Sequence, residues 1–406
     1  MPNGRMLTDI VAHPPAWWRW PETKAVINAL RNEGGSARFV GGCVRDALLG
    51  LATEDIDIAT DLLPGSVIQG LERANILALP TGLDHGTITA VLNKRHFEIT
   101  TLRVDLVGHG RHADIAFTRD WERDAERRDF TINALYLDPE GELIDPVGGL
   151  ADLKMSHIRF IGNADDRIRE DRLRVLRFFR FFARFGDDNP DQHALHACAR
   201  AAGQLDTLSV ERVQKELMLL LDTQNPVAAL DLMEETGVLE AIIGRKPDLS
   251  MLRLLLSLEV PSDALQRFAA LLCVQMDDVL KLANKLRFSN NQKQRLAVMC
   301  AGDVKENMSV QELREALYQL GKKGFEDQVM MLWAQIGAGK DLSSYLLEAA
   351  SWQAPQLPVT GSDLLSHGIA EGAELGNLLR KMEVHWIASG FKSTKAELLR
   401  EVLPDA

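Results

Sequence analysis

The sequence is poor in cysteine, and its thiols do not have the spacing of a metal or redox motif. The four are Cys43, Cys198, Cys273 and Cys300. No two of them form C-x-x-C, and most have apolar neighbours, which argues against disulfides and zinc and indicates a reducing compartment. We therefore expect a cytoplasmic protein with buried thiols.

Long apolar runs are absent as well. No stretch reaches the roughly 18 apolar residues that a membrane-spanning helix needs. No apolar segment follows Arg5, as it would in a signal peptide. We expect neither membrane association nor an obligate protein partner.

An excess of basic charge is also missing. The 406 residues carry a net charge of −12, which argues against a general nucleic-acid coat but not against a local basic groove. Residues 1–185 hold 24 basic and 27 acidic side chains (−3), and residues 186–406 hold 22 and 31 (−9). Because 46% of the residues are apolar, the chain can build sizeable cores in two or more domains.

The pattern of the chain changes near residue 164. Before it, residues 14–33 favour a helix in which three tryptophans act as a packing anchor, and residues 37–138 alternate short strands and helices. In this mixed region we expect a hairpin turn at 93–95, a strand at 132–137 and a mobile loop at 104–127. After residue 164 the pattern is helical with no fixed period, so a regular solenoid is not indicated.

Two acids on one strand are the first candidates for chemistry. In Glu54-Asp55-Ile56-Asp57-Ile58, Asp55 and Asp57 point to one face and the isoleucines to the other. Carboxylates about 7 Å apart along a strand repel each other unless a cation lies between them, and oxygen ligands of this kind suit Mg²⁺. The alternative is a half-exposed edge strand with solvated acids.

A glycine pair lies just before this strand. Val40-Gly41-Gly42-Cys43-Val44-Arg45 reads as strand, turn and helix start. Glycine lets the backbone approach a phosphate, the N–H groups of the next helix turn point at it, and Arg45 adds a charged contact. This predicts an anion cradle beside the acidic pair, although a glycine pair is often only a turn.

Two further stretches stay ambiguous from spacing alone. Glu98 shares a strand face with Thr100 and is either a third carboxylate of the site or a solvated side chain. Arg127-Arg128-Asp129, ahead of an apolar run, either forms a surface salt bridge or holds triphosphate oxygens.

The basic residues concentrate in one helix. Residues 167–184 hold seven arginines interleaved with apolar side chains, and Arg174, Arg177, Arg180 and Arg184 recur at helical spacing on one face, with Asp171 one turn before Arg174. The aromatic residues on the other sides predict a buried helix whose arginine stripe needs an anionic partner, for which phosphate is the natural choice.

The pair Asp171 and Arg174 permits a sharper inference. Cytosine and adenine each present an amino donor beside a ring-nitrogen acceptor, whereas uracil and guanine present carbonyl and N–H groups there. A carboxylate and a guanidinium would therefore accept C and A and leave U and G with unpaired groups, which is costly in a buried site.

Together these motifs resemble the class II tRNA nucleotidyltransferases, the CCA-adding enzymes related to bacterial poly(A) polymerases. The residues that carry the resemblance are Gly41-Gly42-x-x-Arg45-Asp46, Asp55-x-Asp57, Arg127 to Ala134, Asp145-Pro146 with Gly148-Gly149 and Asp152-Leu153, Glu170-Asp171-x-x-Arg174, and the run from Ser209 to Leu217. The resemblance covers about residues 36–217; beyond 220 it extends only to an all-helical body and tail.

The resemblance implies an α+β fold: a polymerase-β-like nucleotidyltransferase head with a small mixed or antiparallel sheet, then an all-α neck, body and tail. It implies an N-terminal extension at 1–35, a catalytic head at 36–160, a neck at 161–222 that selects nucleotides, and a tRNA-binding body and tail at 223–406.

Roles for single residues follow from the same resemblance. Asp55 and Asp57 would hold two Mg²⁺ ions, with Glu98 a less certain third carboxylate. The nucleotide would be bound by Gly42, Arg45, Arg128, Asp171, Arg174, Arg177 and Arg180. Asp105 and Arg111 would belong to a flexible loop linked to the switch from C to A addition.

The expected reaction is template-independent addition of C, C and A to the 3′ end of tRNA from CTP and ATP, with release of pyrophosphate. The alternatives are a poly(A) polymerase or an A-only enzyme of the same superfamily, and an RNA-binding protein without catalysis. The retained acidic pair argues against the last.

Overall fold

The computed structural model describes all residues except 1–8, 106–114, 188, 259, 338 and 403–406. The chain divides into two compact units, Met1–Lys246 and Pro247–Ala406. The described residues include no helix that is long and apolar enough to cross a membrane.

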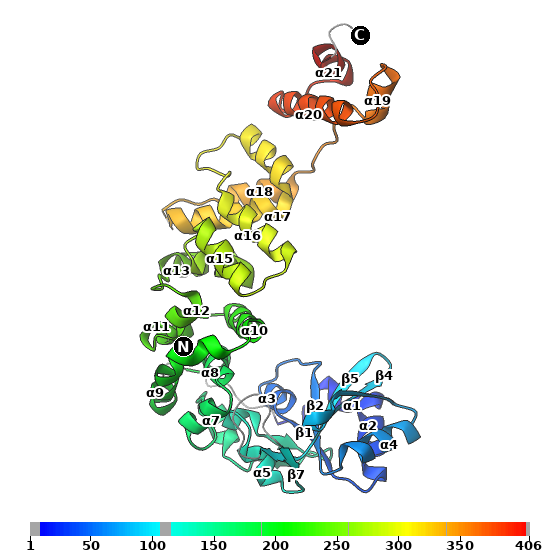
Figure 1. The fold of residues 1–406 in the computed structure, drawn as a ribbon, viewed down its shortest axis with the longest axis vertical. Helices are drawn as coiled ribbons and strands as arrows, with labels where there is room; N and C mark the ends of the chain where they lie inside the picture. The colour runs from blue at the N-terminus through cyan, green and yellow to red at the C-terminus, as the bar shows by residue number, and fades with distance from the viewer. Residues whose placement is uncertain (1–8, 106–114, 188, 259, 338, 403–406) are drawn as a thin grey trace. The chain divides into compact units, whose positions relative to one another are not determined.

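The first unit combines a mixed sheet with helices (Figure 1). Its strands are β1 (Ala37–Val40), β2 (Ile56–Thr60), β3 (Leu77–Gly82), β4 (Thr87–Leu92), β5 (Arg95–Thr101), β6 (Arg103–Asp105), β7 (Ile115–Phe117), β8 (Tyr136–Leu137) and β9 (Leu143–Ile144). Its helices are α1 (Ala16–Arg19), α2 (Pro21–Asn32), α3 (Gly42–Leu48), α4 (Pro64–Arg73), α5 (Trp121–Glu126), α6 (Gly149–Lys154), α7 (Ala164–Glu170), α8 (Leu173–Phe185), α9 (Gln192–Ala201), α10 (Val210–Leu221), α11 (Val227–Glu235) and α12 (Val238–Ile243).

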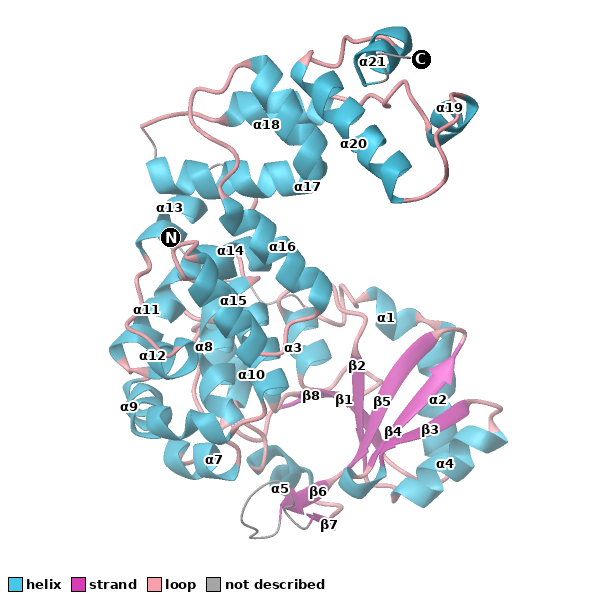
Figure 2. Cartoon of the chain, turned by 45° about the horizontal axis from the view of Figure 1, so that its top comes forward, coloured by secondary structure: helices cyan, strands magenta, loops and turns pink. Residues whose placement is uncertain are grey.

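Seven strands form one sheet in the order β3-β4-β5-β2-β1-β8-β9. Among the described strands of this sheet, β2 and β5 alone pair in parallel, with Asp57 opposite Glu98, and the other pairs are antiparallel. Helices α2 and α4 lie on one side of β3, β4 and β5 (Figure 2). The expected α+β class is therefore confirmed.

Local sequence explains several of these elements. Asn93 and Lys94 both have positive φ, which is the conformation of a two-residue hairpin turn, so the hairpin expected at 93–95 is confirmed. Trp17 is buried against Phe39, with ring centroids 4.7 Å apart, which agrees with its expected role as a packing anchor.

Two expectations in the mixed region are wrong in part. Of the strand expected at 132–137, the last two residues form β8, whereas 131–133 form a 3-10 turn in which the N–H groups of Asn133 and Ala134 donate to the carbonyls of Phe130 and Thr131. The described parts of 104–127 contain β6, β7 and α5, and the Asp120 carboxylate caps α5 by accepting from two backbone N–H groups.

The packing of α8 decides which way its arginines face. Phe178 lies 5.8 Å from Phe160 and Phe181 lies 5.2 Å from Phe130, measured between ring centroids. Burying this aromatic side fixes the rotation of the helix, because an amphipathic helix places its apolar stripe against the core. The opposite, arginine-bearing side is left facing the pocket described below.

All regular secondary structure among the described residues of the second unit is helical. It contains α13 (Ser250–Ser257), α14 (Ala264–Leu271), α15 (Met276–Lys285), α16 (Asn290–Ala301), α17 (Val310–Ile336), α18 (Ser343–Ser351), α19 (Gly361–Ser366), α20 (Ala373–Ala388) and α21 (Lys395–Val402). Helix α17 is kinked at Gly321, whose φ of 68° no helix interior can accommodate. The fully buried Asp327 accepts from Arg295 at 2.7 Å and from Gln266 at 2.9 Å.

Candidate active site

One pocket of about 1250 Å³ in the first unit collects most of the residues singled out in the sequence. It lies between the sheet and α8. The candidates that line it are Gly42, Arg45, Asp55, Asp57, Glu98, Arg128, Asp171, Arg174, Arg177 and Arg180.

The acidic wall of this pocket consists of Asp55, Asp57 and Glu98. Asp55 directly precedes β2, and the parallel register sets Asp57 beside Glu98. Burial, followed by the charge of Glu98, raises the pKa of Asp57 to about 6, although Arg128 and Arg45 oppose the rise. Burial is the first cause of this rise, so a cation near the acidic wall would favour the charged form of the carboxylate.

The donors of the acidic wall fit a magnesium ion that also binds substrate. Carboxylate oxygens are the ligands that Mg²⁺ prefers, and it is often held by one or two carboxylates plus phosphate oxygens. Within the described residues, no group of three or more acidic, histidine or cysteine side chains converges closely enough to hold an ion by itself.

The glycine turn stands beside the acidic wall. Gly41 has φ +72° and ψ −124°, a conformation that residues with a side chain rarely adopt, and Gly42 begins α3. A Cβ built on Gly41 would lie 3.7 Å from an Nη atom of Arg128. The guanidinium of Arg128 and the first turn of α3 therefore approach the same space.

Arg45 has buried partners of its own. It is 5% exposed, donates to Asp46 at 2.7 and 2.8 Å, and donates to the Asn133 amide oxygen at 2.5 Å. Its guanidinium also lies 4.3 Å from the ring centre of Phe185. These partners fix Arg45 at the floor of the pocket.

Arg128 is held by a carboxylate that the sequence analysis did not single out. Asp124 is fully buried and accepts from Arg128 at 3.0 Å, from Arg127 at 2.9 Å and from the Tyr136 hydroxyl at 2.8 Å. Burial raises the pKa of Asp124, but Arg128 and Arg127 outweigh it and lower the pKa to about 2. The spacing of Asp124 three and four residues before the arginines was a usable signal.

The arginine face of α8 consists of Arg174, Arg177, Arg180 and Arg184, all of which line the pocket. Each is paired with a carboxylate of the protein: Arg174 with Glu170, Arg177 with Asp129, Arg180 with Glu216 and Arg184 with Asp46. The sequence favoured phosphate as the anionic partner of the stripe, whereas in the structure carboxylates of the protein itself contact all four arginines.

Asp171 is not part of the arginine helix, contrary to the expected continuous face. It has extended backbone (φ −149°, ψ 106°) between α7 and α8, and its carboxylate accepts from Arg212 at 2.6 Å and from the Leu173 N–H at 3.1 Å. Arg174 donates to Glu170 and to the Arg127 carbonyl. The two residues line the same pocket but have separate partners.

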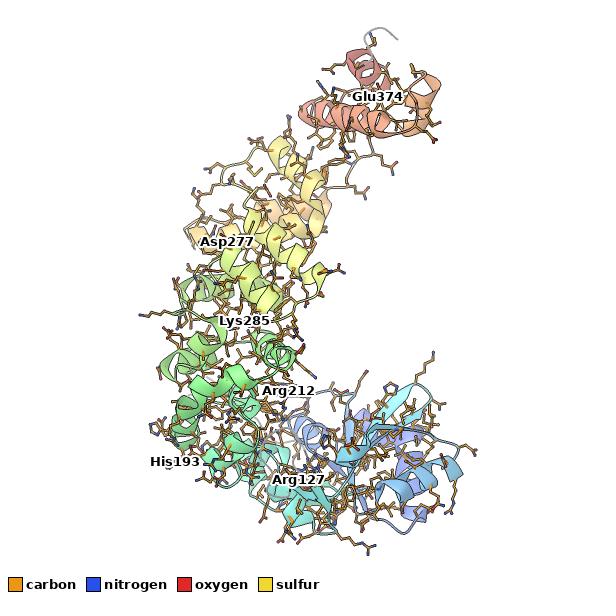
Figure 3. The ribbon with its side chains drawn as sticks, viewed as in Figure 1. Arg127, His193, Arg212, Asp277, Lys285 and Glu374 are labelled. Atoms are coloured by element: carbon orange, nitrogen blue, oxygen red, sulfur yellow. The ribbon has the colours of Figure 1, made fainter. Side chains whose placement is uncertain are left out.

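Helix α10 supplies two residues that sequence reasoning did not assign. Arg212, labelled in Figure 3, holds Asp171, and Glu216 one turn later accepts from Arg180 at 2.5 Å and lies 3.8 Å from Arg177. Both belong to the run 209–217 noted above, and their i, i+4 spacing places them on one side of α10.

Asp105, one of the two residues expected in the flexible loop, does not line this pocket. Asp105 ends β6 and lines a second pocket of about 730 Å³, which Asp171 and Arg212 also line. Arg111 lies outside the described residues.

Known protein families and single relatives match this chain over most of its length. Residues 37–159 match the family described as the poly(A) polymerase head domain, and residues 189–252 match a probable RNA- and SrmB-binding site of polymerase A. The mitochondrial CCA tRNA nucleotidyltransferase 1 of Mus musculus is 35% identical over 389 residues, covering 93% of this chain and 88% of that protein. The CCA-adding enzyme of Enterococcus faecalis is 30% identical over 393 residues, covering 93% and 94%.

A solved structure extends the likeness to the fold. The Bacillus stearothermophilus CCA-adding enzyme in complex with CTP has a TM-score of 0.76 and 27% identity, covering 94% of this chain and 96% of that one.

Proposed function

This chain belongs to the class II tRNA nucleotidyltransferase family, and we propose that it adds C, C and A to the 3′ end of tRNA from CTP and ATP, releasing pyrophosphate. The observation that carries the proposal is the single pocket in which the acidic wall, the glycine turn and the arginine face meet. Relatives named for CCA addition cover about nine tenths of the chain.

The acidic wall and the glycine turn would serve the chemistry. Asp55 and Asp57, with Glu98 as a third carboxylate, would hold Mg²⁺, which lowers the pKa of an attacking hydroxyl and neutralises charge on leaving phosphates. The Gly42 N–H and Arg128 would hold triphosphate oxygens, and Arg45 would fix the turn from below. The register that sets Asp57 beside Glu98, with Asp55 just before β2, supports a cation at this position.

The helix side would choose the nucleotide. The Asp171 carboxylate would accept from the amino group of C or A, Arg174 would donate to the ring nitrogen, and Arg177 and Arg180 would continue the nucleotide-binding face. Asp105 and Arg111 would act in the switch from C to A. We also propose a cytoplasmic location and the division into an extension (1–35), catalytic head (36–160), neck (161–222) and tRNA-binding body and tail (223–406).

The second candidate is a poly(A) or A-only polymerase, which the matches to poly(A) polymerase regions favour. The deciding assay gives the purified protein Mg²⁺ and tRNA ending at the discriminator base, with ATP, CTP, UTP or GTP singly and together. Addition of two C and one A supports our proposal. Long A tails, or A added only to tRNA ending in CC, would support the second candidate.

A substitution tests the base-reading role separately. Asp171→Ala should let UTP and GTP compete with CTP and ATP, because the acceptor for the amino group is gone. Unchanged base choice in this variant would refute the assignment of Asp171 while leaving the reaction itself intact.

A further inference from the structure

Part of the catalytic pocket has no role in the function proposed above: the open face of β3, β4 and β5. Side chains alternate along a strand, so Ile88, Ala90 and Phe97 are buried on one face of these strands and the opposite face reaches the pocket. Apart from Glu98, which belongs to the acidic wall, we call its lining side chains the strand platform: Leu79, Thr81, Thr89, Val91 and His96.

The strand platform lies across the acidic wall from the glycine turn. Thr89 is opposite Glu98, Glu98 is opposite Asp57, and β1, which leads into Gly41, is on the other side of β2. With neighbouring strands about 4.8 Å apart, Thr89 lies about 10 Å from Asp57 across the sheet. The order across the pocket is therefore glycine turn, carboxylates, strand platform.

The geometry of in-line nucleotidyl transfer limits which part of the substrates can lie at the strand platform. The attacking and leaving oxygens lie on opposite sides of the phosphorus, and the leaving pyrophosphate belongs at the glycine turn. We propose that the strand platform binds the unpaired 3′ end of the RNA and directs its terminal hydroxyl toward the acidic wall; this rests on the function proposed above.

The chemistry of the platform suits an RNA end whose base changes at each step. Leu79, at 40% exposure, and Val91 offer aliphatic surface, which can contact the face of any base without reading its edge. The hydroxyls of Thr81 and Thr89 are 2.7 Å apart, and since only one hydrogen is shared between them, the other can bond to a ribose or phosphate oxygen. The acidic side chain on the same face, Glu98, lies at the border between the platform and the catalytic carboxylates.

The opposite side of the same pocket carries the charge that an RNA backbone needs. Arg184 and Lys215 line it together with the platform, and phosphate contacts of this kind position a strand without specifying its sequence. The base of the incoming nucleotide is assigned to Asp171 and Arg174, which leaves the platform to the acceptor end.

The chain offers a matched pair of variants to test this. Leu77 and Leu79 are both exposed leucines on the same face of β3, but only Leu79 lines the pocket. Leu79→Glu should raise the KM for a tRNA minihelix ending at the discriminator base about tenfold, because it removes a base contact and adds repulsion. The KM for CTP should stay unchanged, and Leu77→Glu should behave as wild type.

Two further measurements test binding of the RNA 3′ end independently of the proposed nucleotide addition. Minihelices ending in each of the four bases should show the same loss, since the platform reads no base edge. In direct binding, Leu79→Glu should weaken a minihelix with an unpaired 3′ nucleotide but not a blunt one.

The proposed role of the platform would be refuted if Leu77→Glu and Leu79→Glu behaved alike in both the kinetic and the binding assay. A rise in the KM for CTP alone would also refute it. Absence of incorporation by the wild-type protein would count against the proposed function only, because the binding comparison is independent of turnover.

Discussion

The two sides of the pocket, the arginine face of α8 and the acidic wall on the sheet, differ in how their charges are compensated. On the helix side, each arginine of the arginine face has a protein carboxylate within 3.4 Å. On the sheet side, Asp57 faces Glu98 and Asp55, and its pKa rises to about 6. The arginines are thus paired within the protein, whereas the acids repel one another, and a cation would relieve this repulsion.

This contrast also separates specificity from chemistry. A side chain held by a partner within the protein presents a fixed pattern of donors and acceptors, which suits recognition of a base edge. Carboxylates whose mutual repulsion a metal ion would relieve suit a transfer reaction that any nucleotide could undergo.

The largest effect should come from the acidic wall. Asp57→Asn should lower incorporation roughly a thousandfold or more, because a metal ligand is lost. The same variant should melt at a higher temperature than wild type in the presence of EDTA, since one of the repelling charges is gone. Incorporation assays and calorimetry check this, with Asp84→Asn in an exposed turn as the control.

If Asp57→Asn instead lowered the melting temperature of the metal-free protein, the acidic wall would be a structural network rather than a site waiting for a cation, and the contrast drawn above would fail.

The next effect concerns the anchoring of the arginine face. Glu216 is 5% exposed and contacts both Arg180 and Arg177. Glu216→Gln should destabilise the first unit by about 3 kcal/mol, because it leaves buried positive charge without its partner, and should raise the KM for both CTP and ATP. Denaturant unfolding and steady-state kinetics measure the two effects.

The exposed pair Arg200–Asp165 gives the control. Asp165→Asn should change stability little, since exposed ion pairs contribute little. Equal stability of Asp165→Asn and Glu216→Gln would show that the arginine face does not depend on its carboxylates.

A pH effect should follow from Asp124. Its pKa is lowered to about 2 from an ordinary 3.8, so its contribution is complete above about pH 4 and disappears as the pH falls toward 2. The shift corresponds to about 2 kcal/mol of unfolding free energy. Unfolding of wild type and Asp124→Asn at pH 6 and pH 2.5 should show a difference that shrinks in acid.

Glu126→Gln serves as the matched control for Asp124, because Glu126 is an exposed carboxylate on the same helix. A gap between wild type and Asp124→Asn that stays constant with pH would contradict the assigned pKa.

The smallest effect should appear at Arg212. Arg212→Gln removes the charged partner of Asp171 but little buried structure, since the Arg212 side chain is 41% exposed. We expect the preference for CTP over UTP to fall about tenfold with stability nearly unchanged. Arg172→Gln, whose partner is Gln204, should keep the preference; a similar fall in both variants would count against a positioning role for Arg212.

The sequence by itself determined the features that depend on neighbouring residues. Alternation placed Asp55 and Asp57 on one strand face, the glycine pair marked the turn, and helical spacing put the four arginines on one side of α8. Local spacing suffices for these because strand and helix periods fix which side chains share a face.

Only the tertiary structure decided the pairings over long distances. Glu98 lies beside Asp57 because β5 pairs in parallel with β2, Asp129 reaches Arg177 across 48 residues, and Glu216 reaches Arg180 across 36. The structure also shows that the helix is interrupted at Asp171, whose carboxylate accepts from Arg212 rather than from Arg174. Buried charges take the partners that the fold brings near, and no local period encodes which these will be.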